Sequence, residues 1–154
     1  QTLYSPSPRI MGLDGQFKMS KSRENYISMK DEPDTIRKKL STAFTDPDRK
    51  RRSDPGNPDI CNLFTLHNSF STDDQVAMID TECRNAGIGC VDCKKVLADN
   101  MIAEIDPIQT DYHDLVKRPD DVRDALARGA GRIKTLVLET LEEVRAKLGL
   151  RGGI

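Results

Sequence analysis

Hydrophobic residues recur at helical spacing over most of the chain that follows residue 30. Ile36, Leu40, Ala43 and Phe44 make one stripe behind Pro33, which suits a first helical position, and this helix should end before Asp46-Pro47. Residues 1–30 lack this spacing and predict strand and loop. The segment 45–58 holds three prolines, a glycine and a basic cluster, and therefore predicts a long ordered loop.

Five further helices are predicted along the rest of the chain. One spans about 59–70, and the next is expected to begin with a cap made by Ser71 with Asp74 and to close at Gly87. Another covers 90–116, where Pro107 should kink or interrupt it. A short helix near Pro119 should precede a last, longer one that ends before Gly149. We interpret the apolar stripes of these helices as core, including Val76, Ile79 and Cys83; Val96, Leu97, Met101 and Ile105; and Ile133, Leu136, Val137, Leu141, Val144 and Leu148.

Composition agrees with one ordinary helical domain of 154 residues and limits its partners. No apolar run is long enough for a membrane-spanning helix or the core of a signal peptide, so no membrane partner is expected. The formal net charge of −1 gives no global attraction to DNA or RNA. RNA contacts must then come from local basic patches, and each of these is equally interpretable as solvated surface charge: Arg49, Lys50, Arg51, Arg52, Lys94 and Lys95.

The densest chemical signal is the segment Lys18-Met19-Ser20-Lys21-Ser22, which follows the glycine-containing stretch 12–15. Glycines allow a tight turn and a mobile loop, and such a loop can wrap a polyphosphate. Lysine ammonium groups are compact charges that can follow phosphates as they move, while hydroxyls and backbone N–H groups complete the cradle. We therefore predict phosphate binding by all five residues, with Lys18 and Lys21 stabilising the transition state. A solvated lysine-serine loop without function is the alternative.

This segment resembles the signature loop of class I aminoacyl-tRNA synthetases, and the chain resembles bacterial tryptophanyl-tRNA synthetases over nearly its whole length. The resemblance extends over the segments 9–13, 39–46, 54–63, 95–99, 107–112 and 140–150. It implies a mainly α fold: residues 1–30 would be the last strand and loop of a Rossmann-type catalytic domain with the KMSKS loop, and residues 31–154 a helical anticodon-binding domain.

The resemblance also implies an activity, partners and a cellular place for the full-length protein. These are ATP-dependent activation of tryptophan with Mg²⁺, transfer to tRNA(Trp), a homodimer and the cytoplasm. The chain opens at Gln1 without Met and holds no His-Ile-Gly-His-like element, so we expect a C-terminal part that is inactive alone. Two rivals stay open: a tyrosine–tRNA ligase, and a non-catalytic RNA-binding module stapled by a metal.

All four cysteines of the chain form one pattern, C-x21-C-x6-C-x2-C. Disulfides are not expected in a cytosolic ligase. Four thiolates can bind Zn²⁺ tetrahedrally or hold a [4Fe-4S] cluster with one cysteine per iron, and buried free cysteines are also ordinary core residues. A subset of the resembled family carries a similar pattern and such a cluster, with a first interval that differs by about one residue. The predicted ligands are Cys61, Cys83, Cys90 and Cys93; the only histidines, His67 and His113, are interpreted as helix residues without a catalytic role.

Overall fold

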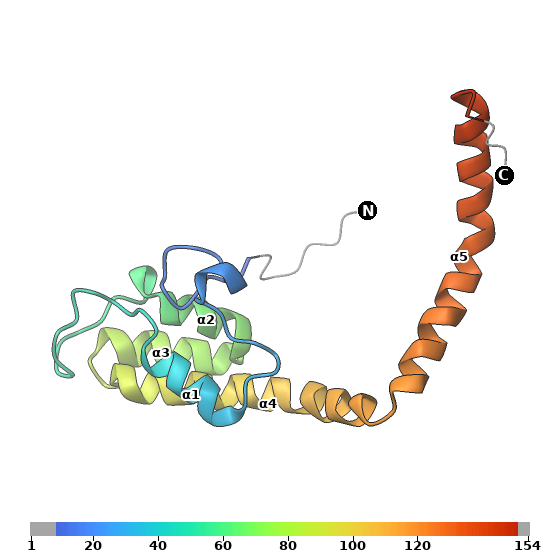
Figure 1. Ribbon diagram of the computed structural model, residues 1–154. Coiled ribbons are helices and arrows are strands. Elements are labelled where there is room, and N and C mark those ends of the chain that lie inside the picture. Colours follow the sequence, from blue (N-terminus) through green and yellow to red (C-terminus); the bar gives the residue numbers. More distant parts are fainter. Residues whose placement is uncertain (1–8, 151–154) are drawn as a thin grey trace. The chain divides into compact units, whose positions relative to one another are not determined.

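The computed structural model describes residues 9–150, and this part is mainly helical, as predicted (Figure 1). Within it no strand forms, and the only β-type pairing is an isolated antiparallel bridge between Met11 and Lys18. The elements are η1 (Lys21–Arg23), α1 (Pro33–Ser41), η2 (Pro58–Ile60), α2 (Asn62–Phe70), α3 (Asp73–Arg84), α4 (Cys90–Val116) and α5 (Pro119–Lys147), where η marks a 3₁₀-helix.

The chain divides into two compact units, and the first, up to residue 109, contains the hydrophobic core. Helices α1, α2, α3 and the first half of α4 contribute all of the core residues except Ala43, which follows α1, and Leu97 of α4 is fully buried. Residues of the segment 9–30 pack against this core as partly buried side chains, among them Leu13 and Ile27. The core consists of Ile36, Leu40, Ala43, Leu63, Leu66, Ile79, Cys93, Leu97, Ala98 and Met101.

Several helix ends differ from the predicted ones by a few residues. Helix α1 stops at Ser41, so Phe44 lies outside it and is 43% exposed. Helix α3 is capped by Thr72, not by Ser71: Thr72 Oγ1 accepts from Gln75 N, and Gln75 Oε1 accepts from Thr72 N. This reciprocal pair is a capping box, which satisfies two backbone donors that would otherwise lack partners.

The end of α3 also differs, because Ala86 with φ +57° takes the left-handed position that Gly87 was expected to fill. Alanine pays for this conformation with steric strain that glycine avoids. Pro107 was expected to kink or interrupt the fourth helix; it does not interrupt α4, which continues through it to Val116. Ala103, whose carbonyl loses its helical donor to Pro107, is exposed, so water can take the place of the missing N–H.

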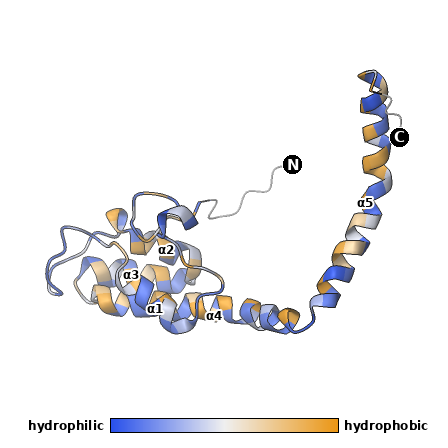
Figure 2. Ribbon diagram, in the orientation of Figure 1, coloured by the Kyte–Doolittle hydropathy of each residue, from blue (hydrophilic) through white to orange (hydrophobic). Residues whose placement is uncertain are grey.

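The second unit, residues 110–154, contains α5, a single helix of 29 residues where a short and a long helix were expected. Figure 2 shows hydrophobic and hydrophilic residues interleaved along it. No residue of α5 is buried; Leu136 is 64% and Ile133 57% exposed, so the interpretation of its stripe as core is wrong for the described structure. One helix cannot bury its own apolar stripe, because burial needs a second element.

Among residues 9–150, no helix combines the length and the apolar character that crossing a membrane would require.

Candidate functional site: a lysine loop and four cysteines

The predicted phosphate loop, residues 18–22, begins as one arm of a tight hairpin. Met19 N donates to Ile10 O at 3.1 Å and Gly12 N donates to Phe17 O at 2.7 Å, on either side of the Met11–Lys18 bridge. Ser20 remains extended, and the chain then makes the single turn η1. Backbone hydrogen bonds of the hairpin thus fix the position of the start of the loop.

The side chains of the loop are left open to solvent. Lys18 and Lys21 are exposed, and neither ammonium group has a hydrogen-bond or ion-pair partner among residues 9–150. Ser20 Oγ and Ser22 Oγ lie 2.9 Å apart and share one hydrogen bond. Two unpaired cations beside two hydroxyls and a short helix are the elements that a polyphosphate needs.

Asp14 shapes the turn that precedes the loop. Its Oδ1 accepts from Gln16 N at 3.0 Å and from Phe17 N at 3.2 Å. These backbone donors, Gln16 N first, hold the pKa of the Asp14 carboxyl below its ordinary value, although desolvation opposes them. The carboxylate is therefore the stable acceptor of the turn.

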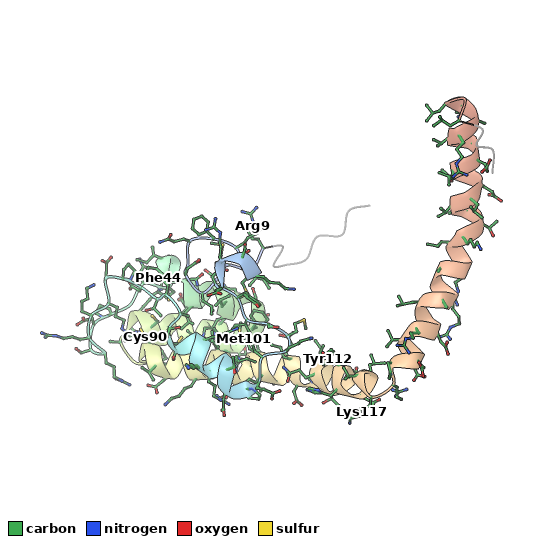
Figure 3. All side chains as sticks on the ribbon, in the orientation of Figure 1. Arg9, Phe44, Cys90, Met101, Tyr112 and Lys117 are labelled. Atoms are coloured by element: carbon green, nitrogen blue, oxygen red, sulfur yellow. The ribbon has the colours of Figure 1, made fainter. Side chains whose placement is uncertain are left out.

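Helices α2, α3 and α4 supply the four cysteines from their ends. Cys61 precedes α2, Cys83 lies in the last turn of α3, and Cys90 and Cys93 lie in the first turn of α4, where Figure 3 labels Cys90. Burial first, and then the neighbouring thiols, raise the pKa of Cys93 to about 12. The thiol of Cys83 has a raised pKa for the same reasons, opposed by a nearby arginine. The four cysteines thus lie near enough to influence one another.

That arginine is Arg49, which belongs to the predicted basic run but differs from its neighbours. Its Nη1 lies 3.8 Å from Cys83 Sγ and 4.0 Å from Cys90 Sγ, and its Nη2 donates to the carbonyls of Ile88 and Arg52 at 2.8 Å each. The remaining three residues of the run, Lys50 to Arg52, are exposed. Arg49 is therefore a side chain directed at sulfur, which a run of four charges in the sequence does not indicate.

Two observations fit an anionic group held by these thiolates. Arg49 Nε is buried without a hydrogen-bond partner in the described structure, so one donor of the side chain that reaches Cys83 and Cys90 is unused. A Cβ on Gly56 would lie 2.5 Å from Cys83 Sγ, so only glycine permits this approach. However, within residues 9–150 no group of three or more His, Cys, Asp or Glu side chains is arranged to hold a metal ion. Zn²⁺ needs its four sulfurs around one point, whereas a [4Fe-4S] cluster takes each thiolate on a separate iron.

His67, the buried histidine of α2, borders the cysteines and contributes packing, as predicted. Its Nδ1 lies 2.7 Å from Ser71 Oγ, and its Nε2 lies 3.3 Å from both the carbonyl oxygen and the Sγ of Cys93. Burial lowers its pKa to about 4, which keeps the imidazole neutral near pH 7.

The predicted RNA contacts lie on both sides of Cys90. One cavity of about 310 Å³ is lined by Arg37, Lys94 and Lys95 together with Cys90 and Val91. A second, also of about 310 Å³, is lined by residues 49–52 and again by Cys90 and Val91. Val91 is 67% exposed between them. The fold thus brings two basic segments, distant in sequence, to the same end of α4.

Comparison with known proteins places the chain in a family. Residues 2–105 match the family of class I tRNA synthetases specific for W and Y, and the chain belongs to this family. The chain is 46% identical over 141 residues to the tryptophan–tRNA ligase of Deinococcus radiodurans, covering 92% of this chain and 43% of that protein. It is 34% identical over 151 residues to the tryptophan–tRNA ligase of Aquifex aeolicus, covering 97% of this chain and 38% of that protein.

Solved structures agree with this assignment. A crystal structure of tryptophanyl-tRNA synthetase from Campylobacter jejuni matches with a TM-score of 0.80 and 25% identity, covering 92% of this chain and 45% of that one. The same enzyme complexed with ADP and tryptophan matches with the same TM-score. The chain therefore spans less than half the length of the relatives that it matches.

Proposed function

We propose that this chain is the C-terminal part of a tryptophan–tRNA ligase and that it supplies the KMSKS phosphate loop and the anticodon-binding helices. The observation that carries the proposal is the loop 18–22, whose two lysines extend unpaired from a backbone fixed by the hairpin with residues 10–12. The family match includes the enzymes for both amino acids, and the relatives named tryptophan–tRNA ligase support the choice of tryptophan over tyrosine.

In the first step of this reaction the carboxylate of tryptophan attacks the α-phosphate of ATP. A new carboxyl–phosphate bond forms, the bond to the β-phosphate breaks, and tryptophanyl-AMP and pyrophosphate result. Negative charge grows on the α-phosphate and on the departing pyrophosphate, and Lys18 and Lys21 would stabilise it. Mg²⁺ accompanies the ATP and neutralises its phosphates. Ser20 and Ser22, with their shared hydrogen bond, orient the loop around the same oxygens.

For the four cysteines we propose a structural [4Fe-4S] cluster, with Zn²⁺ as the alternative. When bound, the cluster supplies Fe–S bonds that tie α2, α3 and α4 together, and the ligase reaction requires no redox step from it. Arg49 would place its guanidinium beside the Cys83 and Cys90 thiolates, and Gly56 leaves the room that Cys83 needs. Burial first, and then the neighbouring thiols, raise the pKa of Cys83 and of Cys93, so a resident cation would favour the thiolate form that both need as ligands.

For tRNA(Trp) we propose contacts at the two basic cavities that meet at Cys90 and Val91. Lys50, Arg51 and Arg52 line one cavity and Lys94 and Lys95 the other. An unstacked anticodon base could lie against exposed Val91 while phosphates on either side meet the cations. The net charge of −1 leaves no attraction to nucleic acid apart from such patches.

The experiment that tests the proposal is amino-acid-dependent ATP–pyrophosphate exchange by the full-length protein. Tryptophan is expected to support exchange, and tyrosine is not. Exchange with tyrosine alone would replace the proposal by the tyrosine ligase. Binding of tRNA without exchange in the presence of either amino acid would favour a non-catalytic RNA-binding module.

A further inference from the structure

A buried asparagine, Asn25, contacts the KMSKS loop and the preceding turn, and both polar atoms of its side-chain amide bind them. Asn25 is 6% exposed. Its Oδ1 accepts from Ser20 N at 2.8 Å, and its Nδ2 donates to Asp14 Oδ2 at 2.7 Å and to Lys18 O at 3.3 Å. A primary amide has one oxygen and two N–H groups, so each of its polar positions is engaged.

These bonds hold the backbone on both sides of Met19. The carbonyl of Lys18 and the N–H of Ser20 both end on the same amide. Side chains alternate along an extended chain, so fixing these two peptide groups fixes the side on which Lys18 and Ser20 project. Arg23 N donates back to Ser20 O at 3.3 Å, which makes the turn that carries Lys21 start from the same fixed point.

Asp14 holds the asparagine in this orientation. One carboxylate oxygen caps the turn at Gln16 and Phe17, and the other accepts from Asn25 Nδ2. If the amide of Asn25 were reversed, its oxygen would face the Asp14 carboxylate and its NH₂ would face Ser20 N–H. The charge of Asp14 therefore selects one orientation of the amide.

Asn25 and the turn that it binds pack tightly against each other and are hydrogen-bonded to α2. A Cβ on Gly12 would lie 2.2 Å from Asn25 Nδ2, so glycine is required for the contact. Asn62, the first residue of α2, donates from Nδ2 to Gly12 O at 2.9 Å. Side-chain and backbone hydrogen bonds thereby fix the position of the loop relative to α2, and the lysines of the loop take no part in them.

We infer that Asn25, oriented by Asp14, is the positioning residue that directs Lys18 and Lys21 toward the phosphates of ATP during activation. This inference rests on the proposed function. Because neither lysine has a side-chain partner of its own among residues 9–150, the direction of each is set by the backbone that Asn25 holds. Misplacing a charge by about 1 Å can cost about 10²-fold in rate. Asn25 itself touches no substrate, so its loss should slow the reaction more than it weakens ATP binding.

The test exchanges the two side chains of the pair. Asn25→Asp removes the amide donor and leaves two carboxylates facing each other. Asp14→Asn removes the carboxylate acceptor and leaves two amide NH₂ groups facing each other. The double variant Asp14→Asn/Asn25→Asp restores a donor opposite an acceptor, keeps the Ser20 N acceptor and leaves the net charge of the chain unchanged. Asn68→Asp, an exposed position of α2, is the control for the same chemical change.

In the full-length enzyme each single variant is expected to lower kcat of tryptophan-dependent ATP–pyrophosphate exchange by about 10- to 10²-fold, with KM for ATP changed by less than about threefold. The double variant should recover part of the loss, because the pairing of positions 14 and 25 and the acceptor for Ser20 N return but the donor to Lys18 O does not, and Asn68→Asp should match wild type. Single variants with wild-type kcat, or losses that simply multiply in the double variant, overturn the inference.

A second measurement separates this inference from the proposed function. Hydrogen exchange of the Ser20 amide, followed by NMR, should be faster in both single variants than in wild type and slow again in the double variant. A wild-type protein without ATP–pyrophosphate exchange activity would reject the proposed ligase function. Hydrogen exchange of the Ser20 amide would still decide whether Asn25 and Asp14 hold the loop backbone. Equal hydrogen-exchange rates of the Ser20 amide in wild type and all variants would overturn the inference about Asn25.

Discussion

The lysine loop and the cysteine region lie in the same helical unit but place their reactive groups in opposite environments. In the loop, polar side chains bind the backbone, and the ammonium groups of Lys18 and Lys21 remain exposed and unpaired among residues 9–150. In the cysteine region, Arg49 binds backbone carbonyls and faces sulfur, Cys93 is buried, and its thiol has a pKa raised to about 12. The difference fits the two kinds of ligand proposed above. An open loop suits a substrate that arrives and leaves, whereas partly buried neighbouring thiols suit a resident group bound as the protein folds.

The largest effect should follow from breaking the resident site. Cys90→Ser or Cys93→Ser is expected to lower iron from about four per chain in anaerobically purified protein to less than about one, with loss of the brown colour. The free energy of unfolding should fall by several kcal/mol, since binding at a structural site is largely folding free energy. Metal analysis and denaturant unfolding measure both. Metal-free wild type is the control and should unfold close to the variants.

Two other outcomes are informative for the same experiment. Colourless protein with about one zinc per chain would favour Zn²⁺. Four reactive thiols without metal, even after anaerobic reconstitution, would reject both metals and leave the cysteines as core packing.

The next effect concerns the transient site. Lys21→Ala in the full-length enzyme should slow ATP–pyrophosphate exchange by about 10²-fold or more, because a pre-directed charge at the departing phosphates is lost. The KM for ATP should change less than the rate. Lys38→Ala, at an exposed position of α1, is the matched control. Turnover equal to wild type in the Lys21 variant would remove Lys21 from the mechanism.

A third effect tests how far the cysteine region depends on its polar surroundings. His67→Leu should lower the free energy of unfolding by about 2–3 kcal/mol, because it leaves Ser71 Oγ and the Cys93 carbonyl without their buried partner. His113→Leu, at the exposed histidine, should stay within about 0.5 kcal/mol of wild type. Denaturant titration of both variants without metal decides. Equal stabilities would mean that His67 fills space without a polar role.

Sequence patterns predicted what depends on neighbours along the chain. The start of α1 at Pro33, the span of α4 and the mainly helical fold follow from spacing and proline rules, and these predictions are confirmed. The capping box of α3 was also visible as Thr72 and Gln75, three residues apart, and was missed because Ser71 and Asp74 offer a competing pattern.

What depends on distant residues was not predictable in this way. Asn25 and Asp14 are 11 residues apart, and Arg49 meets Cys83 across 34 residues, so neither pairing leaves a periodic signal. The apolar stripe of α5 shows that a periodic signal also has a limit. Its spacing predicted an amphipathic helix but not what covers it, and in the described structure Leu136 and its neighbours are exposed. The assignment of residues 1–30 to a catalytic domain stays a prediction, and residues 1–8 lie outside the described part.

The smallest effect compares two arginines of one basic run. Arg51 is exposed, so Arg51→Ala should weaken tRNA(Trp) binding by less than about tenfold and lower the slope of log affinity against log salt by about 1, with iron content unchanged. Arg49 instead faces Cys83 and Cys90 and binds the carbonyls of Arg52 and Ile88, so Arg49→Ala should reduce iron retention. Each variant is the control for the other, because both remove one guanidinium from the same run. Salt-dependent binding and metal analysis on both proteins measure the difference. If both variants changed only the slope of log affinity against log salt, Arg49 would act as a surface charge like Arg51. Arg49 would then no longer distinguish the resident site from the transient one.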